Sequence, residues 1–327
     1  MLNVKIIGTG HYLPKKKIDS NALDQQLNLP NGTVEKKSGL KSRYFASDEE
    51  TTSYMAAEAA KEALFNAGIK PEDLDVIISA NGAPEQLLPC SAALIQQKLG
   101  LSESNVACFD LNSTCLSFLT ALDVGSYLIA GKRYNCALIV SSDMPSVGLN
   151  WSDMETCTIF GDGAGACVIE QSHEGSRVIA SHMITNSTGV DYCHLKAGGT
   201  RYPPASDYDK TLGLFNMDGK NVFKLASQMV SLMQEALFAK AGCKLTDIHW
   251  VVPHQASQLA MNHVRKRLGI PSEKFVDIFA THGNQMAASM PTALHYLVKN
   301  KLIERGQIVY FLGTGAGLSA AGLLLEY

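Results

Sequence analysis

The stretch EALFNAGIKPEDLDVII at residues 62–78 has a counterpart, EALFAKAGCKLTDIHWVV, at residues 235–252. Each copy begins as an amphipathic helix that ends near a glycine, Gly68 in the first and Gly242 in the second. A short link then leads to an apolar segment flanked by turn residues, which is typical of a buried β-strand. A helix followed by a strand, once in each half of the chain, predicts a duplicated α/β unit.

The correspondence continues beyond this stretch in the same order. The matched segments are helix ends at 98–101 and 267–270, strands at 106–111 and 275–280, helices around 120–122 and 292–294, and strands at 137–140 and 308–311. We therefore expect two halves, residues 1–171 and 172–327, each with a mostly parallel sheet covered by helices. The helix expected at 115–131 is strongly apolar, so the halves should pack as layers of one body.

Composition excludes several classes of protein. The chain has 327 residues, of which 46% are hydrophobic and 18% charged, and a formal net charge of −3. This apolar content argues against disorder, and the near-neutral charge argues against a nucleic-acid binder. The apolar stretches have the length of strands, too short to span a membrane, and the N-terminus lacks the pattern of a signal peptide. We expect a cytoplasmic protein that binds neither membrane nor nucleic acid.

The cysteines fit a reducing compartment. There are eight, with no CxxC pair and no Cys/His spacing suited to zinc. We expect reduced thiols that mostly fill the core, and no metal site. The remaining question is whether one of the eight has a different role.

Three reactive or polar residues are expected at equivalent strand ends. A shift that carries Gly100 onto Gly269 also carries Cys115 onto Asn284, and we expect both to follow a strand and begin a helix. His254 likewise follows the apolar strand at 250–253. Because sites in open α/β units lie beyond the carboxyl ends of strands, these three side chains should converge.

The residue types suggest carbon–carbon bond formation. A thiol at a helix start feels the positive end of the helix dipole, so we expect a lowered pKa for Cys115. A neutral His254 and the amide of Asn284 can both donate hydrogen bonds to a carbonyl oxygen that becomes an enolate after loss of CO2. A protease-like site, with His254 as a base oriented by Asn284, is the lower-ranked reading.

Two glycine-rich turns occur at 160–166 and 313–317. The first lacks the Lys-Ser/Thr of a phosphate-binding loop, and no acidic residue follows the second at the distance of a ribose ligand. Both fit tight turns where backbone approaches a neighbouring segment. The second turn could also aim a backbone N–H at a thioester oxygen and form an oxyanion hole with the N–H of Cys115.

Together these segments resemble the β-ketoacyl-acyl-carrier-protein synthase III family of thiolase-superfamily condensing enzymes, over essentially the full length. The resemblance lies in the Cys115 segment, both glycine-rich turns, and the segments Val252 to Ala256 and His282 to Asn284. It implies an α/β fold, a thiolase-like five-layered αβαβα sandwich built from two duplicated halves, and a homodimer.

The resemblance also implies a mechanism and partners. Cys115 would be acylated by an acyl thioester, with its own N–H and that of Ala316 holding the oxyanion, and His254 and Asn284 would stabilise the enolate of a malonyl thioester. CoA or phosphopantetheine thioesters would be substrates, and no cofactor or metal would be needed. Carrier-protein docking would use basic residues near the entrance, namely Lys224, Arg265, Lys266 and Arg267.

The sequence departs from the family pattern around the nucleophile, where Leu116 and Ser117 stand in place of Ala or Ser and Gly, and at Leu259, where an Arg is common. Two alternatives therefore stay open. One is a non-condensing acyltransferase or thioester hydrolase that uses the same acyl-Cys. The other is a non-catalytic scaffold subunit.

Overall fold

The computed structural model describes residues 1–327 and contains two main sheets. The first has five strands in the order β1 (Val4–Tyr12), β7 (Gly163–Gln171), β6 (Cys136–Asp143), β4 (Val76–Ser79) and β5 (Ala107–Asp110). The second has four, in the order β8 (Arg177–Thr185), β13 (Ser319–Glu326), β12 (Ile308–Gly315) and β11 (Trp250–Pro253). Taken along the chain, the four strands of the second sheet have the same order and neighbours as β1, β4, β6 and β7 of the first, which is the expected duplication.

The expectation of mostly parallel sheets is wrong. Strand β4 runs parallel to β5 and β6, and β11 runs parallel to β12, but β7 and β13 are antiparallel to both of their neighbours. Only a tight turn separates β12 from β13, and such a turn can join only antiparallel strands, since a parallel pair needs a long crossover. Both sheets are therefore mixed.

The prediction of a strand at 275–280 is also wrong. Phe275 makes a single bridge to Val251, and helix α8 (Phe279–His282) follows after three residues. The carboxylate of Asp277 accepts a hydrogen bond from the backbone N–H of Phe279 at 3.1 Å. A short Asp side chain that bonds its own backbone two residues on favours a turn over a strand. The second half thus lacks a counterpart of β5.

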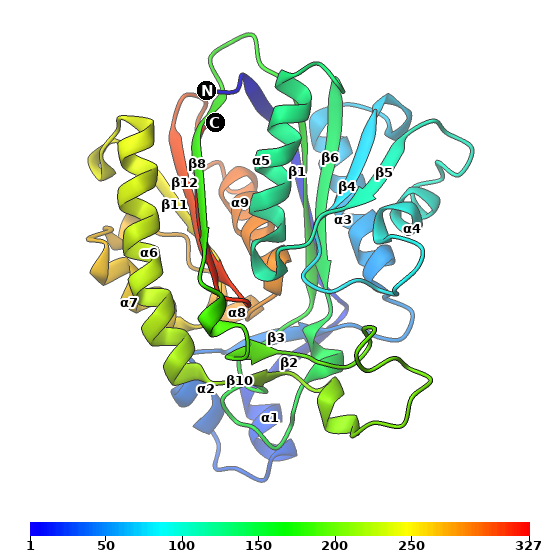
Figure 1. The fold of residues 1–327 in the computed structure, drawn as a ribbon, viewed down its shortest axis with the longest axis vertical. Coiled ribbons are helices and arrows are strands. Elements are labelled where there is room, and N and C mark those ends of the chain that lie inside the picture. Colours follow the sequence, from blue (N-terminus) through cyan, green and yellow to red (C-terminus); the bar gives the residue numbers. More distant parts are fainter.

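The sheets and helices form five layers (Figure 1). Helices α3 (Thr52–Ala67) and α4 (Ser91–Lys98) cover the outer face of the first sheet, and α6 (Gly219–Ala241) and α7 (Gln258–Arg267) cover that of the second. Helices α5 (Ser117–Ala130) and α9 (Ser289–Lys299) lie between the sheets. This arrangement is the predicted αβαβα sandwich. Helix α5 is apolar because it packs on both sheets.

The glycines in the repeated stretch end the outer helices as predicted. Gly68 follows α3 with a φ of 71°, and Gly242 follows α6 with a φ of 66°. Left-handed backbone of this kind favours glycine, and it lets the last turn of each helix satisfy its free carbonyls. In each half the chain then continues into a buried strand, β4 in the first and β11 in the second.

Smaller elements gather at one end of the sandwich, the lower end in Figure 1. They are two antiparallel strand pairs and two short helices: β2 (Lys16–Asp19) with β3 (Ser42–Phe45), β9 (Cys193–His194) with β10 (Asn216–Met217), α1 (Ser20–Gln26) and α2 (Thr33–Ser38). Eight 3₁₀ turns complete the chain: η1 (Pro71–Asp73), η2 (Thr114–Leu116), η3 (Pro145–Gly148), η4 (Ser187–Gly189), η5 (Lys210–Gly213), η6 (Leu245–Asp247), η7 (Ser272–Lys274) and η8 (Met286–Ala288).

The two halves share a core. Strand β7 ends at Gln171 and β8 begins at Arg177, so the link between them separates the strands of the first sheet from those of the second. The largest cluster of buried apolar side chains nevertheless draws on both halves, from Val4 to Tyr327. The halves are layers of one body. No helix has the length and apolar character that crossing a membrane would require.

Candidate active site

Cys115 lies in the 3₁₀ turn η2, between the end of β5 and the start of α5, as the sequence predicted. The preceding residue, Thr114, has a φ of 54°, which is strained for a β-branched side chain. The surrounding hydroxyls hold this shape: Ser117 Oγ donates to Thr114 O at 2.7 Å and accepts from Ser113 N at 2.9 Å. The loop thus places Cys115 at the start of a helix.

The prediction that the pKa of Cys115 is lowered is wrong for the site without substrate. Burial raises the pKa of Cys115 far above its usual value, and the neighbouring Cys193 and Asp143 raise it further. Removing the thiol from water disfavours the charged form more than the short helix start favours it. A nearby base must therefore accept the proton when the sulfur reacts.

His254 directly follows β11, as predicted, and is only 5% exposed. Its backbone N–H donates to Leu312 O at 2.8 Å, and its Nδ1 lies 2.7 Å from Ser289 Oγ. Burial lowers its pKa to about 4, so the ring is neutral at pH 7. When the Ser289 hydroxyl donates to Met286 O, which lies at 2.9 Å, Ser289 can only accept from Nδ1. In that state Nδ1 carries the proton and Nε2 is free to accept one.

Both the backbone and the side chain of Asn284 make hydrogen bonds. Its backbone N–H donates to Ile159 O at 2.8 Å, its Oδ1 accepts from Met286 N at 2.9 Å, and its Nδ2 donates to Ala256 O at 3.1 Å. An amide nitrogen has two hydrogens, so one remains for a substrate oxygen. Asn284 follows α8 and Gly283, however, and not a strand as expected, because the strand at 275–280 is absent.

The second glycine-rich turn brings the segments of Cys115 and His254 together. A Cβ on Gly313 would lie 2.9 Å from His254 Cβ and 3.1 Å from Leu116 Cδ2, and one on Gly315 would lie 2.6 Å from Thr114 Oγ1. At contacts this short, a side chain at either position would force its neighbours to shift. Turn η2 also packs against η8, which follows Asn284. The segments that carry the three predicted residues therefore meet in one region.

Ala316, the predicted second oxyanion donor, lies in the turn between β12 and β13. The hydroxyl of Thr114 lies 3.4 Å from Ala316 O, so this turn is next to the residue that precedes Cys115. The backbone of Ala316 and that of Cys115 are therefore neighbours.

The first glycine-rich turn supports Asn284. Phe160 forms a parallel bridge with Asn284, and Gly161 N donates to Asn284 O at 3.2 Å. The buried guanidinium of Arg43 donates to Phe160 O at 2.9 Å and to Cys157 O at 2.7 Å. Burial lowers the pKa of Arg43 to about 10. The turn is a close backbone approach, as predicted.

Asp143, at the end of β6, is a site residue that the sequence analysis missed. Its buried carboxylate accepts hydrogen bonds from four backbone N–H groups, those of Gly82 at 2.7 Å, Ala83 at 3.2 Å, Ala287 at 3.0 Å and Ala288 at 3.3 Å. Burial raises the pKa of Asp143 to about 7. Asp143 thus ties a first-half loop to η8. Its place at the end of an apolar strand was the signal that could have revealed it.

The proposed docking residues lie on the outer helices α6 and α7, which pack together. Lys224, Lys266 and Arg267 are exposed and Arg265 is half-buried. Arg267 Nε donates to Ser231 Oγ at 2.8 Å. Leu259, in place of the common Arg, is 75% exposed at the start of the same helix. The four residues therefore lie on neighbouring outer helices, and their role in docking stays a prediction.

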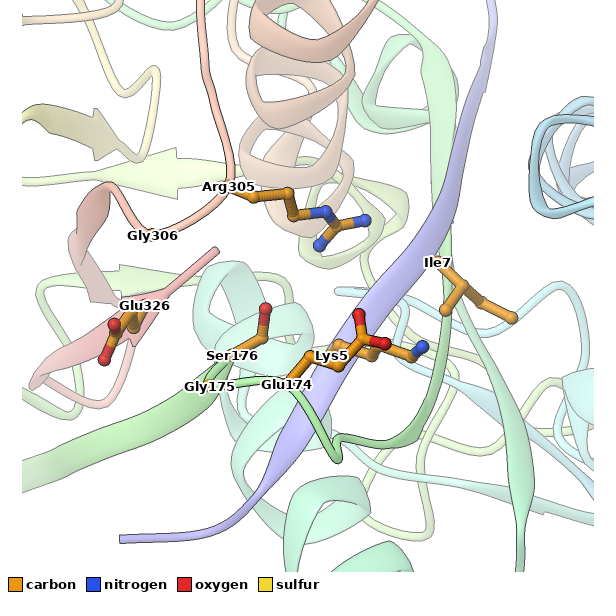
Figure 2. Close-up of a pocket in the computed structure, with 8 residues that line it drawn as sticks. All are labelled: Lys5, Ile7, Glu174, Gly175, Ser176, Arg305, Gly306 and Glu326. Atoms are coloured by element: carbon orange, nitrogen blue, oxygen red, sulfur yellow. The ribbon is translucent and has the colours of Figure 1, made fainter.

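A pocket of ≈ 210 Å³ lies elsewhere, near the chain termini (Figure 2). Its lining includes Lys5, Glu174, Arg305 and Glu326 but none of the predicted site residues. The charges are already used, since Lys5 pairs with Glu170 at 3.0 Å and Arg305 donates to Ile6 O at 2.8 Å. This pocket is not part of the candidate active site.

Known proteins resemble this chain in sequence. Two family models match: 3-oxoacyl-[acyl-carrier-protein (ACP)] synthase III at residues 109–187, and the C-terminal region of the same synthase at 238–327. The β-ketoacyl-[acyl-carrier-protein] synthase III of Clostridium acetobutylicum is 33% identical over 327 residues, which cover 100% of this chain and 99% of the relative. That of Aquifex aeolicus is 34% identical and covered in full, as is this chain.

Solved structures agree. The crystal structure of the 3-oxoacyl-[acyl-carrier-protein] synthase III from Aquifex aeolicus superimposes with a TM-score of 0.90 at 33% identity, over 99% of this chain and 100% of that one. The priming β-ketosynthase of the R1128 polyketide pathway has a TM-score of 0.89 at 28% identity, over 98% of this chain and 96% of that one. The sequence resemblance is confirmed.

Proposed function

The chain belongs to the β-ketoacyl-acyl-carrier-protein synthase III family of acyl-transferring condensing enzymes, and we propose that Cys115, His254 and Asn284 are its catalytic residues. The observation that carries this assignment is the close approach at Gly313, where a Cβ would lie within 3.1 Å of both His254 and Leu116, the residue after Cys115. Asn284 joins them through its bond to Ala256, two residues from His254.

The first half-reaction acylates Cys115. His254 Nε2 accepts the thiol proton, and the sulfur attacks the carbonyl carbon of an acyl thioester. The backbone N–H groups of Cys115 and Ala316 hold the oxyanion. The departing CoA or phosphopantetheine thiolate takes the proton from His254 and leaves as a free thiol. Because burial raises the pKa of Cys115, the proton moves only when His254 is aligned with the sulfur.

The second half-reaction forms the carbon–carbon bond. A malonyl thioester binds, and its carbonyl oxygen accepts hydrogen bonds from His254 Nε2 and Asn284 Nδ2 as CO2 leaves and an enolate forms. The enolate carbon attacks the acyl-Cys, which expels the Cys115 thiolate and releases a β-ketoacyl thioester. For this step Nε2 must carry a proton. Rotation of the Ser289 hydroxyl from Met286 O to His254 Nδ1 permits that tautomer.

The same proposal includes the substrates, the binding partner, the oligomeric state and the location of the enzyme. The thioester and the loss of CO2 provide the driving force, so the chemistry itself needs neither a metal nor an organic cofactor. The substrates are CoA or carrier-protein thioesters, with an acidic acyl carrier protein bound at Lys224, Arg265, Lys266 and Arg267. The enzyme acts as a homodimer in the cytoplasm.

A mass-shift experiment tests the proposal. The purified chain is incubated with acyl-CoA and acyl-carrier-protein donors of varied chain length, and intact mass reports the adduct. Malonyl carrier protein is then added and CO2 release is measured. We expect an adduct on Cys115 that is consumed with CO2 release, and a Cys243→Ala control that behaves like the parent.

The alternatives give different results in the same experiment. A non-condensing acyltransferase or hydrolase would form the adduct and pass it to another acceptor or to water, without CO2 release. A scaffold subunit would form no adduct with any donor. Either result would end the condensing assignment for this chain.

A further inference from the structure

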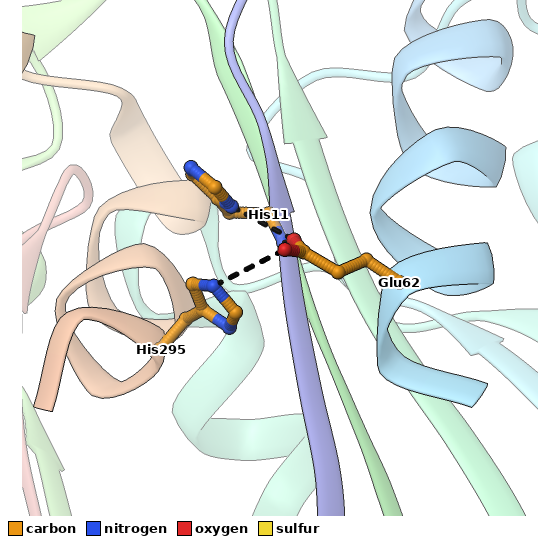
Figure 3. Close-up of side chains that lie close together, drawn as sticks. All are labelled: His11, Glu62 and His295. Carbon is orange, nitrogen blue, oxygen red and sulfur yellow. Dashed lines mark hydrogen bonds and ion pairs between the residues drawn. The ribbon is translucent and has the colours of Figure 1, made fainter. Parts of the chain in front are cut away.

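Two histidines and a glutamate, none of them among the predicted site residues, lie close together (Figure 3). His11 lies on β1, Glu62 on α3 and His295 on α9, so the cluster joins the edge of the first sheet, an outer helix and a central helix. One ligand atom from each residue lies within 4.8 Å of the others. The proposed condensation uses none of them.

The carboxylate of Glu62 has one occupied and one available oxygen. Oε2 accepts from the backbone N–H of His11 at 2.7 Å and lies 2.8 Å from His11 Nδ1. Oε1 lies 3.6 Å from His295 Nε2 and 3.7 Å from Lys299 Nζ. Neither distance is that of a good hydrogen bond. Oε1 thus faces His295 across a gap.

His295 is 3% exposed, and its Nε2 has no hydrogen-bond partner. Its other ring nitrogen, Nδ1, lies 3.1 Å from the buried hydroxyl of Thr9. A metal-binding histidine commonly donates from one ring nitrogen to a nearby oxygen, which leaves the lone pair of the other nitrogen for the ion. With Thr9 as acceptor, His295 Nε2 directs a lone pair at a carboxylate oxygen, which is repulsive unless a cation lies between them.

We propose that this cluster binds a divalent cation of the Zn²⁺ class through His295 Nε2, Glu62 Oε1 and His11 Nδ1, with water in the fourth position. In a tetrahedral zinc site, ligand atoms at the usual 2.0–2.1 Å from the ion lie about 3.4 Å apart. The 3.6 Å between His295 Nε2 and Glu62 Oε1 is close to that spacing. In the structure the His11 ring stacks on that of His295, with centroids 4.6 Å apart and planes at 19°, so the two lone pairs do not converge. To bind the ion the His11 ring turns out of this stack and gives up its bond to Glu62, while its backbone N–H keeps the carboxylate in place.

The bound ion would fasten the two halves. His11 and Glu62 belong to the first half and His295 to the second, so the three are held together only in the folded chain. An ion that binds the native state alone stabilises it by mass action. The site is separate from the condensation and supplies nothing to it. The spacing of residues along the chain could not reveal it, because 284 positions separate the two histidines.

Lys299 competes with the ion. Its ammonium lies 3.7 Å from Glu62 Oε1, and its side chain is 56% exposed, so it can move into solvent when the ion binds. Removing this positive charge should tighten metal binding about tenfold. Thr9→Val keeps the shape but removes the hydroxyl that orients His295, and should weaken binding about tenfold.

The test uses the full-length, untagged chain with Cys115→Ser as the background, which removes the active-site thiol as a ligand. Calorimetry with Zn²⁺ and visible spectroscopy with Co²⁺ measure binding, and thermal unfolding with and without Zn²⁺ measures stabilisation. We expect one ion per chain, the visible bands of tetrahedral Co²⁺, and a higher Tm in Zn²⁺. Glu62→Gln and His11→Asn should each abolish all three.

Glu58→Gln, one turn earlier on α3, and His173→Asn, on an exposed loop, are the matched controls and should bind as the parent does. His11 and Glu62 are both partly exposed, at 24% and 31%, so both variants should fold. No binding by the parent, or binding that is equal in the parent and in the His11→Asn variant, would overturn the proposal.

Discussion

The two loops that the duplication makes equivalent are built in opposite ways. The Cys115 loop leaves a regular strand and turns through a strained Thr114, so it presents one side chain at a helix start. The Asn284 loop leaves a short helix, and hydrogen bonds to Ile159, Ala256 and Met286 hold both its backbone and its side chain. One half thus offers the proposed nucleophile and the other a proposed donor that hydrogen bonds hold in place. The duplication provided two positions, and the local sequence gave each its own chemistry.

The largest effect should come from removing the nucleophile. Cys115→Ala should abolish the acyl adduct and lower condensation by at least about a thousandfold, because the covalent route is lost. Intact mass and CO2 release measure the two steps. Condensation at the parent rate would contradict the assignment of Cys115, and so would an adduct of parent size.

Asn284→Ala should separate the two half-reactions. The acyl adduct should form at close to the parent rate, while decarboxylation should fall by about 100-fold, as for the loss of one oxyanion donor. A single-turnover assay that follows the adduct and CO2 separately checks this. If acylation falls as much as decarboxylation, the two loops do not divide the reaction between them.

Gly313→Ala probes the contact that brings the loops together. The added methyl would lie 2.5 Å from Met290 Cε and 2.9 Å from His254 Cβ, so overpacking should cost about 1–3 kcal/mol of stability and reduce activity. Gly199→Ala is the control, because its Cβ would meet nothing within 4 Å. Equal denaturant midpoints for the two variants would show that the close approach at Gly313 is not needed.

Asp143→Asn tests the hydrogen bonds by which Asp143 joins the two halves, and the dependence of their contribution on pH. An amide cannot accept from four N–H groups, so we expect a loss of about 1–3 kcal/mol. The pKa of Asp143 is raised to about 7, above its unfolded value of about 3.9. Its contribution to stability is therefore fully present below pH 4 and is lost as pH rises to 7.

The Tm of the parent minus that of Asp143→Asn should accordingly fall across this range. His254 contributes in the opposite sense, because its lowered pKa makes stability fall as pH decreases from about 6.5 to 4. His254 is present in both proteins, so its contribution cancels in the difference between the two Tm values. A difference that grows with pH would contradict the raised pKa of Asp143.

The smallest effect should come from the outer helices. Lys266→Glu on α7 should raise KM for malonyl carrier protein about threefold at low salt, and less at high salt, because the charge is exposed. Lys98→Glu, at the end of the equivalent helix α4 in the first half, should have no effect. If both variants raise KM equally, the surface of the second half has no special role in docking.

Much of the fold was predictable because it depends on local patterns. The repeated helix, glycine and strand of residues 62–78 and 235–252 gave the duplication, and helix α5 revealed its place between the sheets by its apolar character. The prediction failed where a short polar contact overrode an apolar run, as at Asp277. It also failed where turn length decided strand direction, as between β12 and β13.

The candidate site was predictable in its residue types but not in its electrostatics. Cys115 and His254 follow strands as predicted, and their segments meet. The pKa of the thiol was predicted in the wrong direction, because burial depends on residues that are distant in the chain. Asp143 was missed for a related reason, since its four backbone partners come from two loops that only the fold brings together.

The sequence alone determined the duplicated architecture and the residues able to do chemistry, because helix and strand periodicity and side-chain type are local properties. Tertiary structure alone decided the direction of the strands, the neutral state of His254, the charge of Asp143 and the meeting of His11, Glu62 and His295. Those features depend on burial and on distances between segments far apart in the chain. Neither quantity is written in any local stretch of sequence.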